Sequence, residues 1–192
     1  MVKYVFNWFC YWCCFKDREE EMKQMGMFDF QARDFLEEIK SNYKVKLEGE
    51  GGACPCCDRW GKVNPFKLTE TMALALRWIQ LNGKESGWVN VQKTAPRWIL
   101  RSKTYPVLAH WEFIEAGGSR DGTWRITKKG LDFIAGFISV PHKVYIYNNK
   151  VWDFSDKNVS FRGCFGSKFD FHEMMSDRYD WNKVRSSREK KK

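Results

Sequence analysis

Hydrophobic residues recur with helical spacing in two parts of the chain, and each part predicts an amphipathic helix. The first helix is expected over residues 28–40, where the apolar positions are Phe28, Ala32, Phe35, Leu36 and Ile39. The second is expected from Phe66 to Asn82, with Asn64 as its cap and Pro65 in its first turn. Glycines at positions 49, 51 and 52 lie between the two helices and predict a flexible joint.

After residue 83 the pattern changes to short strands and helices. A weakly alternating strand is expected at 87–92, followed by a helix over 94–103 and a third, short helix over 105–111. Two further strands flank a glycine-rich loop at 117–122 and predict a hairpin. The order helix, strand, helix, helix, strand, loop, strand is that of a winged helix-turn-helix domain, in which the loop forms the wing.

The remaining residues add elements to this plan. Helical spacing returns at 131–138, a hairpin is expected at 143–155 with its turn at Asn148-Asn149, and a short helix is expected over 169–175. The predicted fold class is α+β. The expected parts are an N-terminal extension with a helix (1–50), a cysteine knuckle (51–63), a winged-helix domain (64–147), a C-terminal hairpin and helix (148–182) and a basic tail (183–192).

Charge is distributed unevenly along the chain, whose net charge is +9. Residues 1–60 hold nine Lys and Arg against eleven Asp and Glu, whereas residues 61–192 hold 24 against 13. Excess positive charge favours polyanionic partners, because neutralising phosphates releases condensed counterions. The alternative is a protein that is basic without such a partner. Aromatic residues, at 17%, suffice both for a core and for part of a contact surface.

The first fifteen residues, MVKYVFNWFCYWCCF, are aromatic and contain three of the seven cysteines. They lack a charged leader and a small-residue cleavage site, and their apolar stretch is too short to span a bilayer. A buried strand, a surface anchor and an extension upstream of a later start all remain open. The sequence predicts a reducing compartment, the host cytoplasm, where cysteines are thiols or metal ligands.

Two C-x-x-C pairs are candidates for a structural zinc site. Cys54 and Cys57 lie in CPCC, where a tight turn can aim two thiolates at one tetrahedral ion, and Cys10 and Cys13 form the second pair. Other possible third or fourth ligands are Cys164, His110, His142 and His172. A redox role is disfavoured because no βαβ context surrounds the pair, and packed free thiols are the remaining alternative.

A basic group near the second and third predicted helices is the candidate nucleic-acid contact. Its members are Arg97, Arg101, Lys103, Tyr105, Arg120 on the wing and Arg125 on the following strand, with Lys93 just upstream. In helix-turn-helix proteins the third helix enters the major groove and neighbouring cations hold phosphates. Here the third helix is largely apolar, which disfavours base reading. A solvated basic face on a protein-binding domain is the alternative.

No catalytic arrangement is apparent from the residues. The sequence has no G-x-S-x-G, Walker or dinucleotide fingerprint, and its three histidines are far apart. Asp170 and Glu173 beside His172 could hold a metal, although an exposed helix surface is the commoner meaning of such a group. We therefore expect no catalytic residues and no small-molecule substrate.

From Cys54 to Met175 the chain resembles an uncharacterised family of small bacteriophage and prophage proteins. The motifs that carry the resemblance are CPCCDRWGKV, LAHWEFIEAG, GTWRITKKGLDFIAG, VPHKVYIYNN and FGSKFDFHEMM. It implies a phage origin and a winged-helix-like core, without an established activity. The expected function is DNA binding in transcription regulation or another DNA transaction. The alternative is a host-takeover or anti-defence protein that binds and inhibits a bacterial protein.

Overall fold

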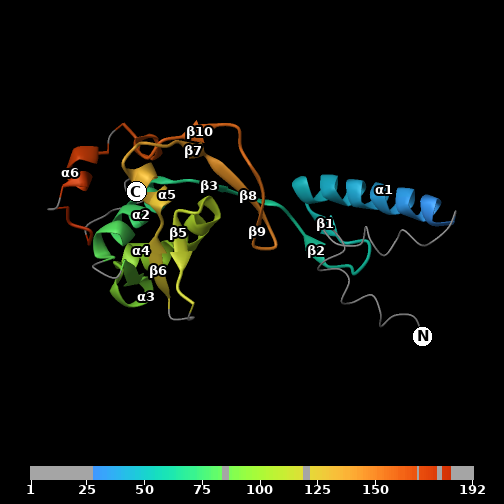
Figure 1. Cartoon of the computed structure of the whole chain (residues 1–192), viewed down its shortest axis with the longest axis horizontal. Helices are drawn as coiled ribbons and strands as arrows, with labels where there is room; N and C mark the ends of the chain where they lie inside the picture. The colour runs from blue at the N-terminus through green and yellow to red at the C-terminus, as the bar shows by residue number, and fades with distance from the viewer. Residues whose placement is uncertain (1–27, 84–86, 119–121, 168, 177–178, 183–192) are drawn as a thin grey trace, which may run out of the picture. The chain divides into compact units, whose positions relative to one another are not determined.

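Helices and short antiparallel strands alternate along the chain, which is an α+β protein as predicted (Figure 1). The computed structural model describes residues 28–83, 87–118, 122–167, 169–176 and 179–182. These residues divide into two units, one made of 28–64 with 147–149 and the other of 65–146 with 150–182. No helix in the described part of the chain combines the length and hydrophobicity needed to cross a membrane.

The first unit consists of a long helix and a small hairpin. Helix α1 (Phe28–Glu48) continues well past the predicted end at residue 40, because Tyr43 and Leu47 extend its apolar stripe and are buried. Strands β1 (Gly52–Ala53) and β2 (Trp60–Gly61) pair antiparallel, and the cysteine turn joins them. Gly61 lies so close to α1 that an added Cβ would be 2.9 Å from Leu47 Cδ2.

The second unit begins with the elements of the predicted winged-helix order. They are α2 (Glu70–Asn82), β4 (Trp88–Asn90), α3 (Val91–Thr94), α4 (Arg97–Ser102), the 3-10 helix η2 (Tyr105–Trp111), β5 (Ile114–Ala116), β6 (Thr123–Ile126) and α5 (Lys128–Ile134). Strand β6 lies between β4 and β5 in an antiparallel sheet, pairing Val89 with Trp124 and Ala116 with Trp124.

The later elements form two further sheets and short helices. Strands β3 (Asn64–Lys67), β8 (Lys143–Tyr147) and β9 (Lys150–Phe154) make a three-stranded sheet in that order. Strands β7 (Val140–Pro141) and β10 (Asn158–Val159) pair antiparallel, and they are followed by the 3-10 helix η3 (Arg162–Cys164) and by α6 (Phe171–Met175). The hairpin turn lies at Asn148-Asn149, as the sequence predicts.

A chain of aromatic rings connects these elements in one core. Phe113 stacks on Phe133 with ring centroids 4.6 Å apart, and Phe133 meets the edge of Phe161 at 5.6 Å. All three rings are essentially inaccessible to solvent. Met174 of α6 is also fully buried in this core. The C-terminal residues are therefore part of the second unit's core, to which they add Phe161 and Met174.

Two predicted helix starts are wrong. The prediction began a helix at Phe66 with Asn64 as its cap, but 64–67 form strand β3 and the helix begins at Glu70. Thr69 is the cap, and its hydroxyl accepts a hydrogen bond from the Met72 N–H at 3.4 Å. The second predicted helix was capped by Thr94, which instead ends α3, while Pro96 precedes α4.

Replacing Gly130 by alanine should destabilise the second unit. An added Cβ would lie 2.4 Å from the Phe113 carbonyl oxygen and 2.8 Å from Ile126 Cγ1, inside the core that α5 covers. We expect a loss of about 1–3 kcal/mol in the free energy of unfolding, as for other overpacked sites, measured by urea denaturation. Gly118→Ala is the control, because no atom lies within 4 Å of its added Cβ. Equal stability of the two variants would contradict this packing.

Candidate nucleic-acid interface and cysteine knuckle

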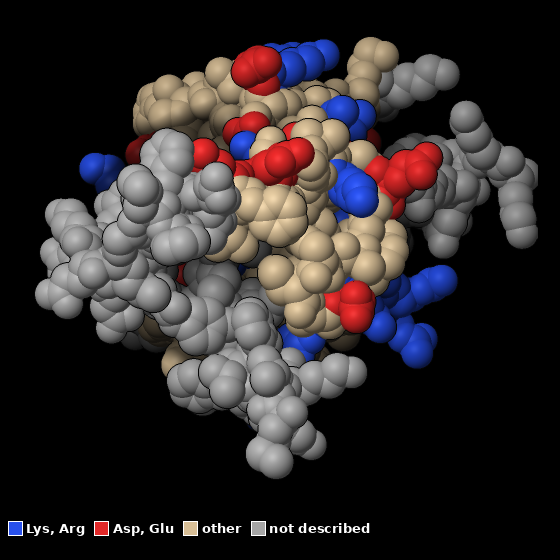
Figure 2. Space-filling view, turned by 90° about the vertical axis from the view of Figure 1, so that its right-hand side faces the viewer, with Lys and Arg blue, Asp and Glu red and all other residues tan. Residues whose placement is uncertain are grey.

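Charged side chains on the face shown in Figure 2 are mixed in sign. Lys and Arg lie among Asp and Glu and apolar residues, without a continuous field of either charge in the part that is described. The basic excess therefore has to be located element by element.

Helix α4 carries the clearest group of cations. Arg97 and Arg101 are one helical turn apart, are exposed, and share a helix without any carboxylate. Lys103 ends the helix in the left-handed conformation, with φ of 50°, and is exposed, as is Lys93 on α3. Among the described residues, none of these four cations makes an ion pair. They remain available to an anionic partner.

The C-terminal segment is held against α4. The indole N–H of Trp98 donates a hydrogen bond to the Trp181 carbonyl at 2.7 Å, and Tyr179 meets the edge of the Trp181 ring at 4.8 Å. The chain therefore approaches residue 183 beside Arg97. Residues 183–192 lie outside the described part, and their sequence contains six Lys and Arg against one Glu.

Tyr105, which was predicted to contact nucleic acid, lies in the core instead. Its side chain is only 6% exposed, and its ring meets the edge of Trp124 at 5.8 Å. The aromatic side chain is buried because η2 packs its first residue beneath the wing sheet. Tyr105 thus supports the position of β6.

The rest of η2 is also turned inward. Leu108 and Trp111 are at most 1% exposed, and the Trp111 indole N–H donates to the Pro141 carbonyl at 2.8 Å. Only seven residues long and with a 3-10 geometry, η2 offers the partly exposed His110 as its one polar edge. Burial lowers the pKa of His110, so this imidazole is neutral at pH 7. The helix is poorly suited to reading base edges.

Arg125 is engaged within the protein. Its Nε donates to Glu115 Oε1 at 2.5 Å, and its guanidinium lies 4.6 Å from the centre of the Trp88 ring. These contacts use the charge and one face of the guanidinium, and they leave Arg125 a weaker candidate for phosphate binding than the α4 arginines. Arg120, the predicted wing contact, lies outside the described residues.

The CPCC segment forms a tight turn between β1 and β2. The Cys54 N–H donates to the Arg59 carbonyl at 2.8 Å, and the Asp58 N–H donates to the Cys54 carbonyl at 2.9 Å. Asp58 closes the turn in the left-handed conformation, with φ of 56°. Cys54 is buried and Cys57 half-buried, whereas Cys56 is exposed. Burial therefore distinguishes the C-x-x-C pair from the cysteine between them, as expected for a knuckle.

The structure does not gather a complete metal site. In the described ranges no three His, Cys, Asp or Glu side chains are close enough to share an ion. Cys10 and Cys13 lie outside the described residues. Cys164 is a poor ligand, because burial raises the pKa of its thiol to about 12 and its Sγ is 3.5 Å from the Ser160 carbonyl oxygen. His142 accompanies three lysines, whose charge opposes a cation.

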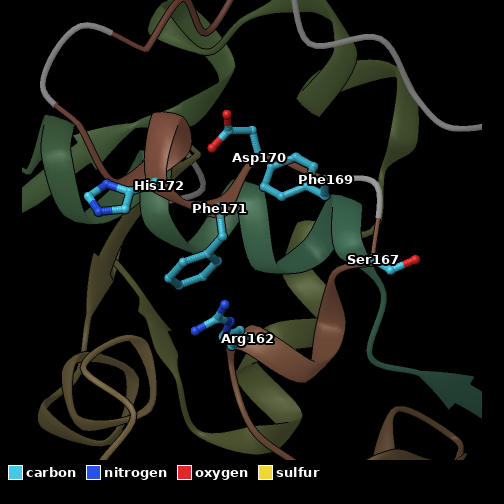
Figure 3. Close-up of a pocket in the computed structure, with 6 residues that line it drawn as sticks. All are labelled: Arg162, Ser167, Phe169, Asp170, Phe171 and His172. Atoms are coloured by element: carbon cyan, nitrogen blue, oxygen red, sulfur yellow. The ribbon is translucent and has the colours of Figure 1, made fainter.

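A shallow cavity of about 400 Å³ lies beside η3 and α6 (Figure 3). The Phe171 ring points toward the Arg162 guanidinium, which lies 5.6 Å from the ring centre. Asp170 and His172 point away from that pair and from each other. The Asp170 carboxylate caps α6 by accepting from the Glu173 N–H at 2.8 Å. These polar groups do not converge on a common point, as a catalytic or metal site would require.

Comparison with known proteins adds no assignment: no protein family, no curated protein and no solved structure matches this chain.

Cys164 should resist alkylation in the folded protein. Its thiol is protonated at neutral and mildly alkaline pH because its pKa is raised, and the thiolate is the reactive form. Iodoacetamide at pH 8 followed by peptide mass spectrometry should label the exposed Cys56 and leave Cys164 unmodified until denaturant is added. Labelling of Cys164 as fast as Cys56 would show that the thiol is not buried as described.

Proposed function

We propose that residues 65–146 form a winged-helix module that binds duplex DNA through its phosphates. The observation that carries this proposal is the group of exposed cations on and beside α4, which has no carboxylate within the helix and no described ion pair. Lys and Arg placed in this way neutralise phosphates and release counterions, which supplies sequence-independent affinity.

The strand order supports the winged-helix assignment. Helices α3, α4 and η2 connect β4 to β5, and β6 returns between those two strands, so that the β5–β6 loop is in the position of a wing. Helix α2 packs against both η2 and β6. This arrangement has the element order and the sheet order of a winged helix, and the proposal rests on topology alone.

Phosphate contact is the favoured mode because the third helix is buried. In a helix-turn-helix protein the exposed face of that helix reads base edges. Here η2 contributes Tyr105, Leu108 and Trp111 to the core. Binding of weak sequence selectivity therefore fits better than recognition of one operator. A bacteriophage origin and a role in transcription regulation or another DNA transaction remain predictions.

An exposed aromatic ring favours a second candidate function, the docking and inhibition of a host protein. Phe137, just after α5, is 81% exposed, and Leu131 of the same helix is 40% exposed. Exposed apolar side chains of this size commonly belong to protein contacts. Co-purification of a host protein that survives nuclease treatment and is lost with Phe137→Ser would support docking over DNA binding.

Reversing the α4 charges should weaken duplex binding. We expect Arg97→Glu/Arg101→Glu to lower affinity for a 20-base-pair duplex about tenfold or more at low salt, measured by fluorescence anisotropy. Removing two phosphate contacts should also reduce the slope of log K against log salt by about 1.8. Both effects follow if the two guanidinium groups neutralise phosphates.

The control keeps the same change in net charge. Lys143→Glu/Lys150→Glu reverses two exposed lysines on β8 and β9, which lie apart from α4 in Figure 1, and should retain most of the duplex affinity. If both double variants lose affinity equally, binding depends on net charge rather than on α4. Absence of any binding by the unaltered chain at low salt would overturn the proposal.

We further propose that the knuckle holds a structural zinc ion through Cys54 and Cys57. The fit rests on the tight turn between β1 and β2 and on the greater burial of these two thiols than of Cys56. Zinc takes four ligands in structural sites, so two more are needed. Cys10 and Cys13 are the matching pair in the sequence, and bound zinc would stabilise the first unit by linking it to the N-terminal segment.

Zinc content should depend on particular cysteines. Protein purified without chelators should hold about one zinc per chain, and Cys54→Ser or Cys57→Ser should abolish it, as measured by elemental analysis. Cys56→Ser is the matched control and should leave the content unchanged. Cys10→Ser/Cys13→Ser should act like the knuckle variants, whereas Cys14→Ser should not. Zinc retained by Cys54→Ser/Cys57→Ser would refute the site.

A further inference from the structure

One face of the β3–β8–β9 sheet carries aromatic and basic side chains together. In β8, Val144 and Ile146 are buried in the core. Successive side chains of a strand point to opposite faces, so Lys143 and Tyr145 lie on the face away from the core. Tyr145 is half-buried and Lys143 is exposed.

The hairpin turn places residues of β9 on the same face. Asn148 and Asn149 both have positive φ, at 49° and 60°, which is the conformation of a two-residue type I′ turn. Lys150 is then opposite the last residue of β8. Alternation places Lys150, Trp152 and Phe154 on the face of Tyr145.

These three rings do not belong to the core. Phe154 is 39% exposed and the other two are half-buried, and none of them is among the described side chains that pack against the core of the second unit. Asp153, the only carboxylate in the three strands, falls on the opposite face by alternation. We name Tyr145, Trp152, Phe154, Lys143 and Lys150 the aromatic strand face.

More lysines surround one end of this face. The Leu68 N–H donates to the His142 carbonyl at 2.9 Å and the His142 N–H donates to the Lys157 carbonyl at 2.7 Å, which brings Lys67 and Lys157 beside Lys143. The pKa of His142 is lowered, first by burial and then by the charges of Lys67, Lys157 and Lys143. His142 is therefore neutral at pH 7, and the lysines supply the positive charge.

We propose that the aromatic strand face binds single-stranded nucleic acid, with bases stacked on Tyr145, Trp152 and Phe154 and phosphates held by the surrounding lysines. Exposed rings on a sheet stack unpaired bases, and this contact is largely independent of sequence. Paired bases are stacked within their helix and cannot use the rings. An acidic peptide would satisfy the lysines but would leave the rings without a partner. This surface is separate from the α4 cations that are proposed to bind duplex DNA.

Single-stranded binding is tested with labelled 20-nucleotide dT and rU oligomers by fluorescence anisotropy. Phe154→Ala should lower affinity for both oligomers, roughly tenfold or more, because a base–aromatic stack is lost. Phe154→Tyr should restore most of it, since a phenol ring also stacks. A difference between dT and rU identifies which of the two nucleic acids the face prefers.

Two controls separate stacking from charge and from folding. Phe137→Ala removes another exposed ring from the same unit and should leave the affinity unchanged. An abasic oligomer of equal length keeps the phosphates and lacks bases, so it should bind more weakly than dT and should be insensitive to Phe154→Ala. Equal binding of abasic and dT oligomers, or unchanged affinity in Phe154→Ala, would overturn the proposal.

The two nucleic-acid surfaces fail independently in these experiments. Lys143→Glu/Lys150→Glu should weaken binding of dT and rU while sparing the duplex, whereas Arg97→Glu/Arg101→Glu should do the reverse. Loss of both activities in the same variant would indicate one shared surface and would contradict the aromatic strand face as a separate site.

Discussion

The stacking of Phe113 on Phe133 is the contact on which the second unit depends. Phe113 immediately precedes β5, and Phe133 lies in α5, so their 4.6 Å separation holds α5 against the wing sheet. Gly130 allows this approach, because any side chain there would meet the Phe113 carbonyl. Phe161 then extends the stack toward η3 and α6. Loosening this one pair would detach both the wing sheet and the C-terminal elements.

The same packing constrains what the putative DNA-facing elements can do. A core of bulky rings draws η2 inward, and the side chains that would read bases become structural. Helix α4 is affected differently: Ile99 is fully buried, while Arg97 and Arg101 remain on the solvent side. Packing thus leaves charge available and removes groove-reading side chains, which is why affinity for phosphates is the better supported property.

The periodicity of the chain predicted most elements but not all of their ends or roles. The order from α2 to β6 followed from apolar spacing and glycine-rich turns, and so did the Asn148-Asn149 hairpin. The start of α2 did not, because Phe66 continues the helical stripe in sequence while pairing of β3 with β8 takes 64–67 into a sheet. Tyr105 was misplaced for a related reason: a phenol looks alike in a core and on a contact surface until its neighbour Trp124 is known. The aromatic strand face was missed, although KVYIY and KVWDF already alternate, because alternation alone does not say which face is buried.

The two proposed surfaces differ in the physical origin of their affinity. At α4 the attraction is between exposed charges and phosphates, and salt screens it over a distance of about 8 Å at physiological ionic strength. On the aromatic strand face the rings contribute through stacking, which does not require a charge and is less sensitive to salt. Rising salt would therefore release duplex DNA before single strands. A chain with both surfaces can hold paired and unpaired nucleic acid at once, and that combination suits a protein acting where a duplex is opened.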